Sequence, residues 1–150
     1  DEELKVSISS QLNLFQERIS LTGAKLHHIK PHGALYNAIA VDEKLAVFFA
    51  NLVKPYLKEA YLYVPYNSVI AKVALKKNIN IKYEAFADRN YNDDLTLVSR
   101  TESKALLIDK NKVFNHILNM IKHQNVVTVT DIEIPIKADT FCVHGDTKTP

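Results

Sequence analysis

Residues 30–37 bring together side chains that can bind polar groups or transfer protons. Lys30 supplies a cation and His32 an imidazole that exchanges a proton near neutral pH; Tyr36 adds a phenol and Asn37 an amide. Such groups could polarise a carbonyl or bind a carboxylate, with the lysine balancing the charge that develops. A strand-to-helix turn with a surface lysine and a capping histidine fits the same spacing, so this segment alone leaves both interpretations open.

A second group of charged side chains lies in and just after a hydrophobic run at residues 81–86. Glu84 and Asp88 carry carboxylates and Arg89 a guanidinium. These three could bind a cation, hold the charged groups of an amino acid, or neutralise one another in a buried ion network. The network is a strong competitor for Arg89, whereas Asp88, just beyond the predicted strand, is the better candidate for chemistry.

The third group lies near the end of the sequence, where His144 and Asp146 flank Gly145. An imidazole and a carboxylate on a tight turn suit metal ligation or general acid/base catalysis. A His-Gly-Asp triplet also occurs often by chance, so the triplet by itself identifies no site.

The remaining histidines and the single cysteine are expected to be structural. His27 and His28 should point to opposite faces of a predicted strand, so at most one of them could face a given ligand. His116 and His123 show no pattern of partner residues and are expected on the surface. Cys142 is expected to be a small buried side chain in a strand.

Strands and helices, which alternate along the chain, must position these groups. Runs of β-branched and aromatic residues predict strands at 25–29, 61–64, 81–86 and 140–143, and two further β-rich runs at 126–130 and 132–136. Helical periodicity and capping residues predict helices over 3–22, from 34, over 42–57, over 68–78 and from 109.

This alternation favours parallel βαβ units, in which the C-terminal ends of the strands share one face. Each polar group lies at such an end, at residues 30–37, 65–68, 84–91 and 144–146. We therefore expect the groups to converge on one pocket.

Two helices carry apolar stripes that predict their inward faces. The stripe of the first helix, expected to pack on the sheet, comprises Ile8, Leu12, Phe15 and Ile19. The stripe of the helix from residue 109 comprises Phe114, Ile117, Leu118 and Ile121. The acidic segment at 92–100 has no steady periodicity and is expected to be a surface loop.

The composition fits a single α/β domain over residues 1–150, being 47% hydrophobic and 24% charged. A net charge of +2 with both signs interspersed does not suggest a nucleic-acid-binding protein. Charges interrupt every hydrophobic segment, so neither a membrane span nor a signal peptide is expected. One cysteine fits a reducing compartment, and we expect a cytoplasmic protein. Because the sequence begins at Asp1 and its single methionine is Met120, we also expect a fragment of a larger protein.

Three segments, taken in this order, resemble the 5-oxoprolinase A-subunit family, also called the LamB/YcsF family. They are residues 30–37 (Lys-Pro-His-Gly-Ala-Leu-Tyr-Asn), residues 84–89 (Glu-Ala-Phe-Ala-Asp-Arg) with Tyr91 and Arg100 after them, and residues 138–146 (Ala-Asp-Thr-Phe-Cys-Val-His-Gly-Asp). The resemblance spans nearly the whole chain and corresponds to the C-terminal two-thirds of the family pattern.

The resemblance implies a distorted, TIM-like (β/α) barrel similar to that of polysaccharide deacetylases, here incomplete because N-terminal strands are missing. It also implies a multi-subunit enzyme in which this chain and two partner subunits use ATP to hydrolyse the lactam of 5-oxo-L-proline to L-glutamate. The catalytic residues that it implies are His32, Asp88, His144 and Asp146. The substrate-binding residues that it implies are Lys30, Asn37, Glu84 and Arg89. A divalent metal is also possible, with His144 and Asp146 as candidate ligands.

The sequence departs from the family pattern in several places. The Asn-Cys-Asp-Leu-Gly-Glu and Gly-Phe-His motifs of the family's N-terminal half do not occur. Leu95 replaces the usual glycine after Asp94, and Ser103 stands in place of a proline, so we expect a reshaped loop after Asp88. Two other functions stay open: metal-dependent amide or ester hydrolysis of the carbohydrate-deacetylase kind, and a non-catalytic scaffold subunit.

Overall fold

A parallel sheet forms the centre of the computed structural model, which describes residues 2–145. Its four strands are β1 (His28–Ile29), β2 (Tyr61–Pro65), β3 (Ile81–Phe86) and β6 (Thr140–Cys142), in the order β1-β2-β3-β6. All three neighbouring pairs are parallel. The predicted βαβ arrangement is confirmed, and the C-terminal ends of the four strands lie along one edge of the sheet.

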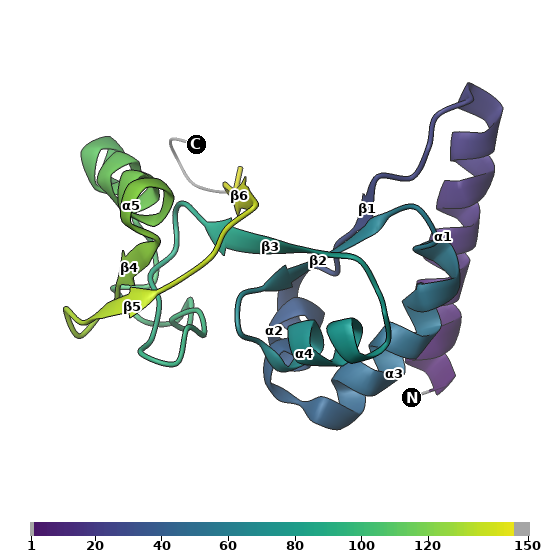
Figure 1. The fold of residues 1–150 in the computed structure, drawn as a ribbon, viewed down its shortest axis with the longest axis horizontal. Coiled ribbons are helices and arrows are strands. Elements are labelled where there is room, and N and C mark those ends of the chain that lie inside the picture. Colours follow the sequence, from purple (N-terminus) through teal and green to yellow (C-terminus); the bar gives the residue numbers. More distant parts are fainter. Residues whose placement is uncertain (1, 146–150) are drawn as a thin grey trace.

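Three helices pack together beside this sheet: α2 (Gly33–Val41), α3 (Glu43–Val53) and α4 (Val69–Lys76) (Figure 1). Side chains cap two of them: Asp42 accepts a hydrogen bond from the Leu45 N–H at 2.9 Å, and Ser68 accepts one from the Ala71 N–H at 3.2 Å. The largest side chains buried in this part of the core are Phe49, Ile39, Leu62, Ile70, Val53 and Val64.

Helix α3 is shorter than its sequence pattern predicts. It ends at Val53, and the chain continues as a 3-10 turn, η1 (Lys54–Tyr56), that contains Pro55. Proline lacks the N–H that an α-helix needs and its ring clashes with the preceding turn. The apolar pattern running to residue 57 therefore belongs to two elements rather than one.

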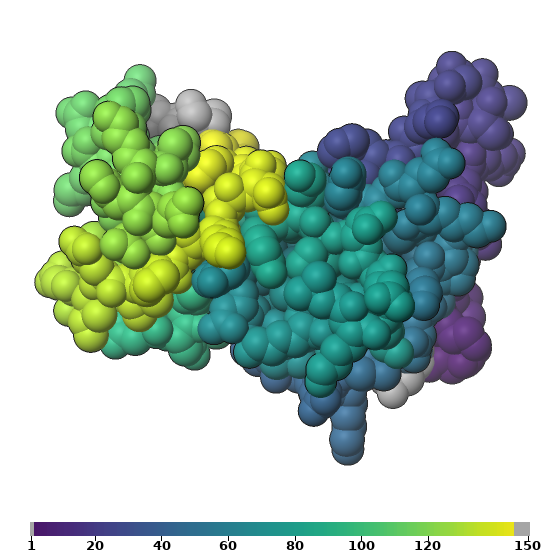
Figure 2. Space-filling view, in the orientation of Figure 1, coloured from purple at the N-terminus to yellow at the C-terminus, as the bar shows by residue number. Residues whose placement is uncertain are grey.

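The N-terminal helix α1 (Glu2–Thr22) packs less closely than predicted. Ile8 and Leu12 contact the core, but Phe15 is 54% exposed, so the prediction that the whole stripe is covered by the sheet is wrong. The helix runs along the outside of α3, and its C-terminal end projects from the body of the molecule (Figures 1 and 2). Gly23, with a φ of +67°, ends it in a left-handed conformation.

The C-terminal part of the chain builds a smaller unit at the far end of β3. It contains α5 (Lys110–His123) and an antiparallel hairpin of β4 (Asn125–Val127) and β5 (Glu133–Pro135). Figure 2 shows this unit, green to yellow, beside the teal helical body. Its hydrophobic cluster includes Phe86, Tyr91, Met120, Val126 and Ile136.

Helix α5 packs through a different face from the one predicted. Phe114 and Ile121 are 62% and 60% exposed, whereas Met120 is buried. A second stripe with the spacing i, i+4, i+7 runs through Val113, Ile117 and Met120, and periodicity alone could not choose between the two. Of the helices in residues 2–145, none has both the length and the hydropathy required to span a membrane.

Candidate functional site

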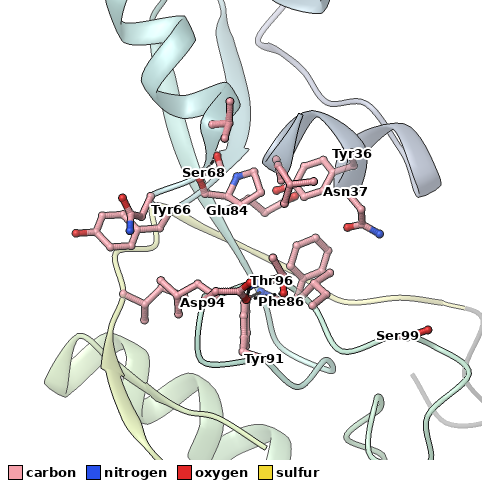
Figure 3. Close-up of a pocket in the computed structure, with 18 residues that line it drawn as sticks. Tyr36, Asn37, Tyr66, Ser68, Glu84, Phe86, Tyr91, Asp94, Thr96 and Ser99 are labelled. Carbon is pink, nitrogen blue, oxygen red and sulfur yellow. Dashed lines mark hydrogen bonds between the residues drawn. The ribbon is translucent and has the colours of Figure 1, made fainter. Parts of the chain in front are cut away.

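Two adjoining cavities lie at the C-terminal ends of the parallel strands. The first, here called the histidine cavity, has a volume of about 700 Å³, and its walls include Lys30, His32, Asn37, Arg89, Cys142 and His144. The second, here called the tyrosine cavity, has a volume of about 570 Å³, and its walls include Tyr36, Tyr66, Ser68, Glu84, Tyr91 and Asp94 (Figure 3). Both cavities are lined by Tyr36, Asn37, Phe86, Leu97 and Ser99. The strand-end groups at residues 30–37, 65–68, 84 and 144 therefore lie around two adjoining cavities with a shared wall, rather than around the single pocket predicted.

Asp88 and His144 form a close polar pair at the ends of β3 and β6. His144 Nδ1 lies 3.0 Å from Asp88 Oδ1, and the main-chain N–H of His144 donates to Asp88 Oδ2 at 2.8 Å. The Asp88 side chain is only 6% exposed, while the His144 side chain is 24% exposed. A carboxylate only accepts hydrogen bonds, so Nδ1 carries a proton in this contact, and in the neutral imidazole Nε2 then holds the lone pair.

Lys30 and Glu84 form a second pair, buried between β1 and β3. Lys30 Nζ lies 2.7 Å from Glu84 Oε1, and the two side chains are 13% and 4% exposed. Burial alone would lower the pKa of Lys30, but its interactions with Glu84 and Cys142 outweigh this effect, and the pKa is raised overall. Lys30 is therefore a buried, protonated cation rather than the surface lysine that the spacing also allowed.

Two aromatic side chains, Tyr36 and Phe86, lie close to the Lys30 ammonium. The ammonium lies 5.7 Å from the Tyr36 ring centroid and 5.3 Å from that of Phe86. Phe86 also stacks on the His144 imidazole, with ring centroids 5.7 Å apart. Phe86 thus contacts both the cation and the acid/base candidate.

Two tyrosines are buried at the tyrosine cavity. Burial is the largest factor that raises the pKa of Tyr36, and the nearby Glu84 carboxylate raises it further. Burial also raises the pKa of Tyr91, although the hydrogen bond that its oxygen accepts from the Phe86 N–H at 2.7 Å opposes this effect. Both side chains are therefore neutral phenols at physiological pH.

His32 and Asn37 occupy the beginning of α2. His32 is exposed at the N-cap position, where its side chain makes no capping hydrogen bond, and lines the histidine cavity. Asn37 lies one turn further along and lines both cavities. Gly33, with a φ of +63°, allows the turn from strand to helix.

Arg89 is buried and holds the loop that closes the cavities. It donates to the main-chain carbonyl of Val98 at 2.6 Å and to that of Ala105 at 3.4 Å. The segment at 92–100 is therefore not simply a surface loop, because Leu95 is 8% exposed and Val98 fully buried. Leu95 has a φ of +66°, a conformation that favours the glycine expected there from the family pattern.

Three of the sequence-based expectations need correction or extension. His27 and His28 do not point to opposite faces, since their Nδ1 atoms lie 3.1 Å apart. His27 precedes the short strand β1, so the rule of alternating faces does not apply to it. His116 is not a surface residue: its ring stacks on Tyr91, and its Nε2 is buried. Cys142 is half-buried and lines the histidine cavity, so it is not simply a buried side chain of a strand. Its position at the C-terminal end of β6 was the sequence signal that could have identified it as a site residue.

The donor set for a metal ion is incomplete in the described part of the chain. Within residues 2–145, no group of three or more His, Cys, Asp or Glu side chains is arranged to hold a metal ion. Asp88 and His144 supply two donors, and Asp146, the other candidate ligand, lies outside the described residues. We therefore derive no step through a metal.

Comparisons with known proteins agree on one family. The sequence pattern of the LamB/YcsF family matches residues 1–150. The 5-oxoprolinase A-subunit of Campylobacter jejuni (strain 81-176) is 43% identical over 124 residues, which are 83% of this chain and 49% of that protein. The 5-oxoprolinase A-subunit of Acinetobacter baumannii (strain AB307-0294) is 36% identical over 146 residues, or 97% of this chain and 58% of that protein. The chain thus spans about half the length of these relatives.

A solved structure has the same fold. The crystal structure of the lactam utilization protein from Thermus thermophilus aligns with a TM-score of 0.86 and 29% sequence identity, over 95% of this chain and 58% of that chain. The expected α/β class is confirmed, with a curled parallel sheet and its helices forming half of a barrel.

Proposed function

The chain belongs to the LamB/YcsF family, and from this premise we propose that it is a subunit of an ATP-dependent 5-oxoprolinase, which hydrolyses 5-oxo-L-proline to L-glutamate. The observation that carries the proposal is the Asp88–His144 pair: His144 lines the same cavity as the buried Lys30 cation, and Asp88 hydrogen-bonds its imidazole. An imidazole oriented by a carboxylate, close to a fixed positive charge, suits hydrolysis of an amide. Relatives named as the A-subunit of 5-oxoprolinase support the same activity.

The chemical difficulty of the reaction is the stability of the lactam. Amide resonance makes its carbonyl carbon a poor electrophile, and phosphorylation of the lactam oxygen at the expense of ATP would convert the amide into a more reactive imidate. The three glycines of the sequence stand far apart, at positions 23, 33 and 145, so they form no glycine-rich phosphate-binding loop. We therefore assign no residue of this chain to the nucleotide and expect the two partner subunits to contribute to its binding.

The residues of this chain have distinct roles in the proposed hydrolysis. Asp88 would fix the His144 tautomer, so that Nε2 takes a proton from the water that attacks the imidate carbon and returns it to the ring nitrogen as the C–N bond breaks. A second water would then hydrolyse the resulting acyl phosphate to glutamate and inorganic phosphate. Lys30 would stabilise negative charge that develops near the Phe86 wall. His32 and Asn37 would bind the substrate carboxylate at the start of α2. Asp146 would complete the acid/base group.

Glu84 and Arg89 act mainly on other side chains in this proposal. Glu84 keeps Lys30 charged and in place, and Arg89 positions residues 95–99 against the substrate. Both contribute to substrate binding by shaping the cavity rather than by donating protons.

The test uses the native protein purified together with its partner subunits. We expect ADP release that depends on 5-oxo-L-proline, with one glutamate formed for each ADP. His144→Ala should reduce this rate at least about a hundredfold, because it removes the general base. His123→Ala, on the exposed end of α5, is the matched control and should leave the rate unchanged. Lactam-dependent ATP hydrolysis that survives His144→Ala, or metal-dependent deacetylation without ATP, would contradict the proposal.

A further inference from the structure

The two cavities are lined by charged side chains of opposite sign. The basic residues that line the histidine cavity are Lys30, His32, Arg89, Arg100 and His144, and no Asp or Glu within residues 2–145 lines it. The tyrosine cavity is lined by Glu84 and Asp94, and by no Lys, Arg or His of the described chain. The whole sequence is almost balanced, with 19 basic and 17 acidic residues, so this separation is local. An anion should therefore prefer the histidine cavity.

Arg100 is more accessible than the two other cations of this cavity that carry a fixed charge. The Lys30 side chain is only 13% exposed, and its ammonium bonds Glu84. Arg89 is 4% exposed and donates to main-chain carbonyls of the loop. Arg100, by contrast, is exposed and lines the cavity. Lys30 and Arg89 therefore add positive charge from within the protein, whereas Arg100 can contact a bound ligand.

Hydrogen bonds hold the backbone that carries Arg100. Val98, two positions earlier, is fully buried, and its carbonyl accepts a hydrogen bond from Arg89 at 2.6 Å. The carbonyl of Ser99 accepts another from the Glu102 N–H at 2.9 Å. Together these bonds close a turn around Arg100, so its backbone has a fixed place at the cavity. A residue with a fixed backbone loses less conformational entropy when it binds a ligand.

A carboxylate fits the Arg100 side chain. The guanidinium is planar and always charged, and its N–H donors form a fork that matches the two oxygens of a carboxylate. His32 lines the same cavity, and because its side chain makes no capping hydrogen bond, it can add a second donor. The volume of about 700 Å³ leaves room for a small ring beside these groups and His144.

We propose that Arg100 binds the carboxylate of the substrate and thereby restricts the enzyme to acidic lactams, which carry a carboxylate on the carbon next to the ring nitrogen. This inference rests on the proposed function and deepens it by naming the substrate class and the residue that selects it. The lactam ring would then lie in the cavity that His144 lines, as the proposed hydrolysis requires.

The experiment uses the native protein purified with its partner subunits and measures, by calorimetry without nucleotide, the binding of 5-oxo-L-proline and of its primary amide. The amide has nearly the same size and shape but carries no charge. We expect the acid to bind at least about tenfold more tightly, because only a carboxylate forms charge-assisted hydrogen bonds with the guanidinium. Arg100→Gln should weaken binding of the acid at least about tenfold and leave that of the amide within about twofold, so that the preference disappears.

Two further variants separate the charge of Arg100 from its shape. Arg100→Lys keeps the charge but loses the fork, and should weaken binding of the acid by a smaller factor, about threefold to fivefold. Arg18→Gln on the exposed face of α1 is the matched control and should leave both affinities unchanged. Because Arg100 is exposed, its replacement should not change the melting temperature, and the comparison of the two ligands on the wild type needs no variant.

The turnover assay gives a second measure of the same role. Arg100→Gln should raise KM for 5-oxo-L-proline at least about tenfold while kcat changes little, because the carboxylate takes no part in the bonds that form and break. A purely structural role of Arg100 would instead lower the melting temperature and weaken binding of the acid and the amide equally, and would overturn the proposal.

The outcomes also separate this subsite from the proposed function. Equal affinity of the wild type for acid and amide, or binding of neither, would overturn the subsite. A preference for the acid that survives Arg100→Gln would overturn it too, and is the result expected if Arg100 binds only phosphate. A preference that depends on Arg100, in a protein that forms no glutamate from ATP and 5-oxo-L-proline, would uphold the subsite and reject the proposed function. ATP-dependent glutamate formation by Arg100→Gln with an unchanged KM would do the reverse.

Discussion

Asp88 and His144 are 56 residues apart in the sequence, yet His144 Nδ1 lies 3.0 Å from Asp88 Oδ1. The register of β3 and β6 explains this contact. Phe86 of β3 pairs with Cys142 of β6, and Asp88 and His144 each lie two residues further along the chain from one member of that pair. Because the two strands are parallel, the segments that follow them leave the sheet at the same edge. The pair is therefore fixed by strand pairing and by a second hydrogen bond, from the His144 N–H.

Replacing Asp88 by asparagine should reduce lactam-dependent ATP hydrolysis by about 10²–10⁴-fold. An amide can present its NH₂ to Nδ1, which favours the opposite tautomer and puts the proton on Nε2. Asp131→Asn is the control, because Asp131 is exposed and its φ of +61° suits asparagine. A rate for Asp88→Asn within twofold of the wild type, with an unchanged melting temperature, would show that the carboxylate does not orient the imidazole for catalysis.

Lys30→Met should lower the free energy of unfolding by about 3 kcal/mol, because it leaves the buried Glu84 carboxylate without its counter-ion. The double variant with Glu84→Gln should recover a large part of this loss, since no buried charge remains. Chemical denaturation of the single and double variants measures both effects.

The control for this cycle is the exposed pair of Lys25 and Glu59, which lie 3.4 Å apart with side chains 87% and 80% exposed. Lys25→Met should change stability by less than about 0.5 kcal/mol, as solvent screens such a pair. Equal effects of Lys30→Met and Lys25→Met would contradict the view that burial makes the Lys30–Glu84 pair important.

Arg89→Lys should loosen the loop at 92–100 while keeping the positive charge. Lysine cannot reproduce the planar fork that bonds the carbonyls of Val98 and Ala105, and we expect a loss of about 2 kcal/mol. Because this loop lines both cavities, KM for the lactam should rise, and limited proteolysis should cut the loop faster. Arg18→Lys on the exposed face of α1 should change neither property, and a normal KM for Arg89→Lys would remove Arg89 from the substrate-binding residues.

The positions of the strands and their parallel direction were the parts of the site that sequence could predict. Hydrophobic runs placed Lys30, Asp88 and His144 at strand ends, and parallel pairing then brings such ends to one edge. The Lys30–Glu84 bond could not be predicted in this way, because β2 lies between β1 and β3 and the two long side chains must reach across it. Only the packed structure reveals such a contact.

Faces of helices and loops were harder to predict from sequence. Helix α5 carries two apolar stripes, and the packing of Met120 decides between them. The acidic composition of residues 92–100 predicted a solvent-exposed loop, but Val98 is buried and the buried Arg89 side chain donates to the main-chain carbonyl of Val98. In both places, tertiary contacts override the local pattern.

His116 should make the protein less stable as the pH falls below about 6.5. Burial lowers the pKa of His116, while the carbonyls of Arg89 and Phe86 oppose this shift only in part. The unfolded chain therefore binds more protons, so the stability is full above the unfolded pKa and is lost as the pH falls through the folded pKa. His116→Leu should flatten the plot of unfolding free energy between pH 7 and pH 5, by up to about 1.4 kcal/mol per pH unit. His28, whose pKa is also lowered by burial, should leave a residual slope. His123→Leu should follow the wild type, and parallel profiles for His116→Leu and the wild type would show that His116 is not the titrating group.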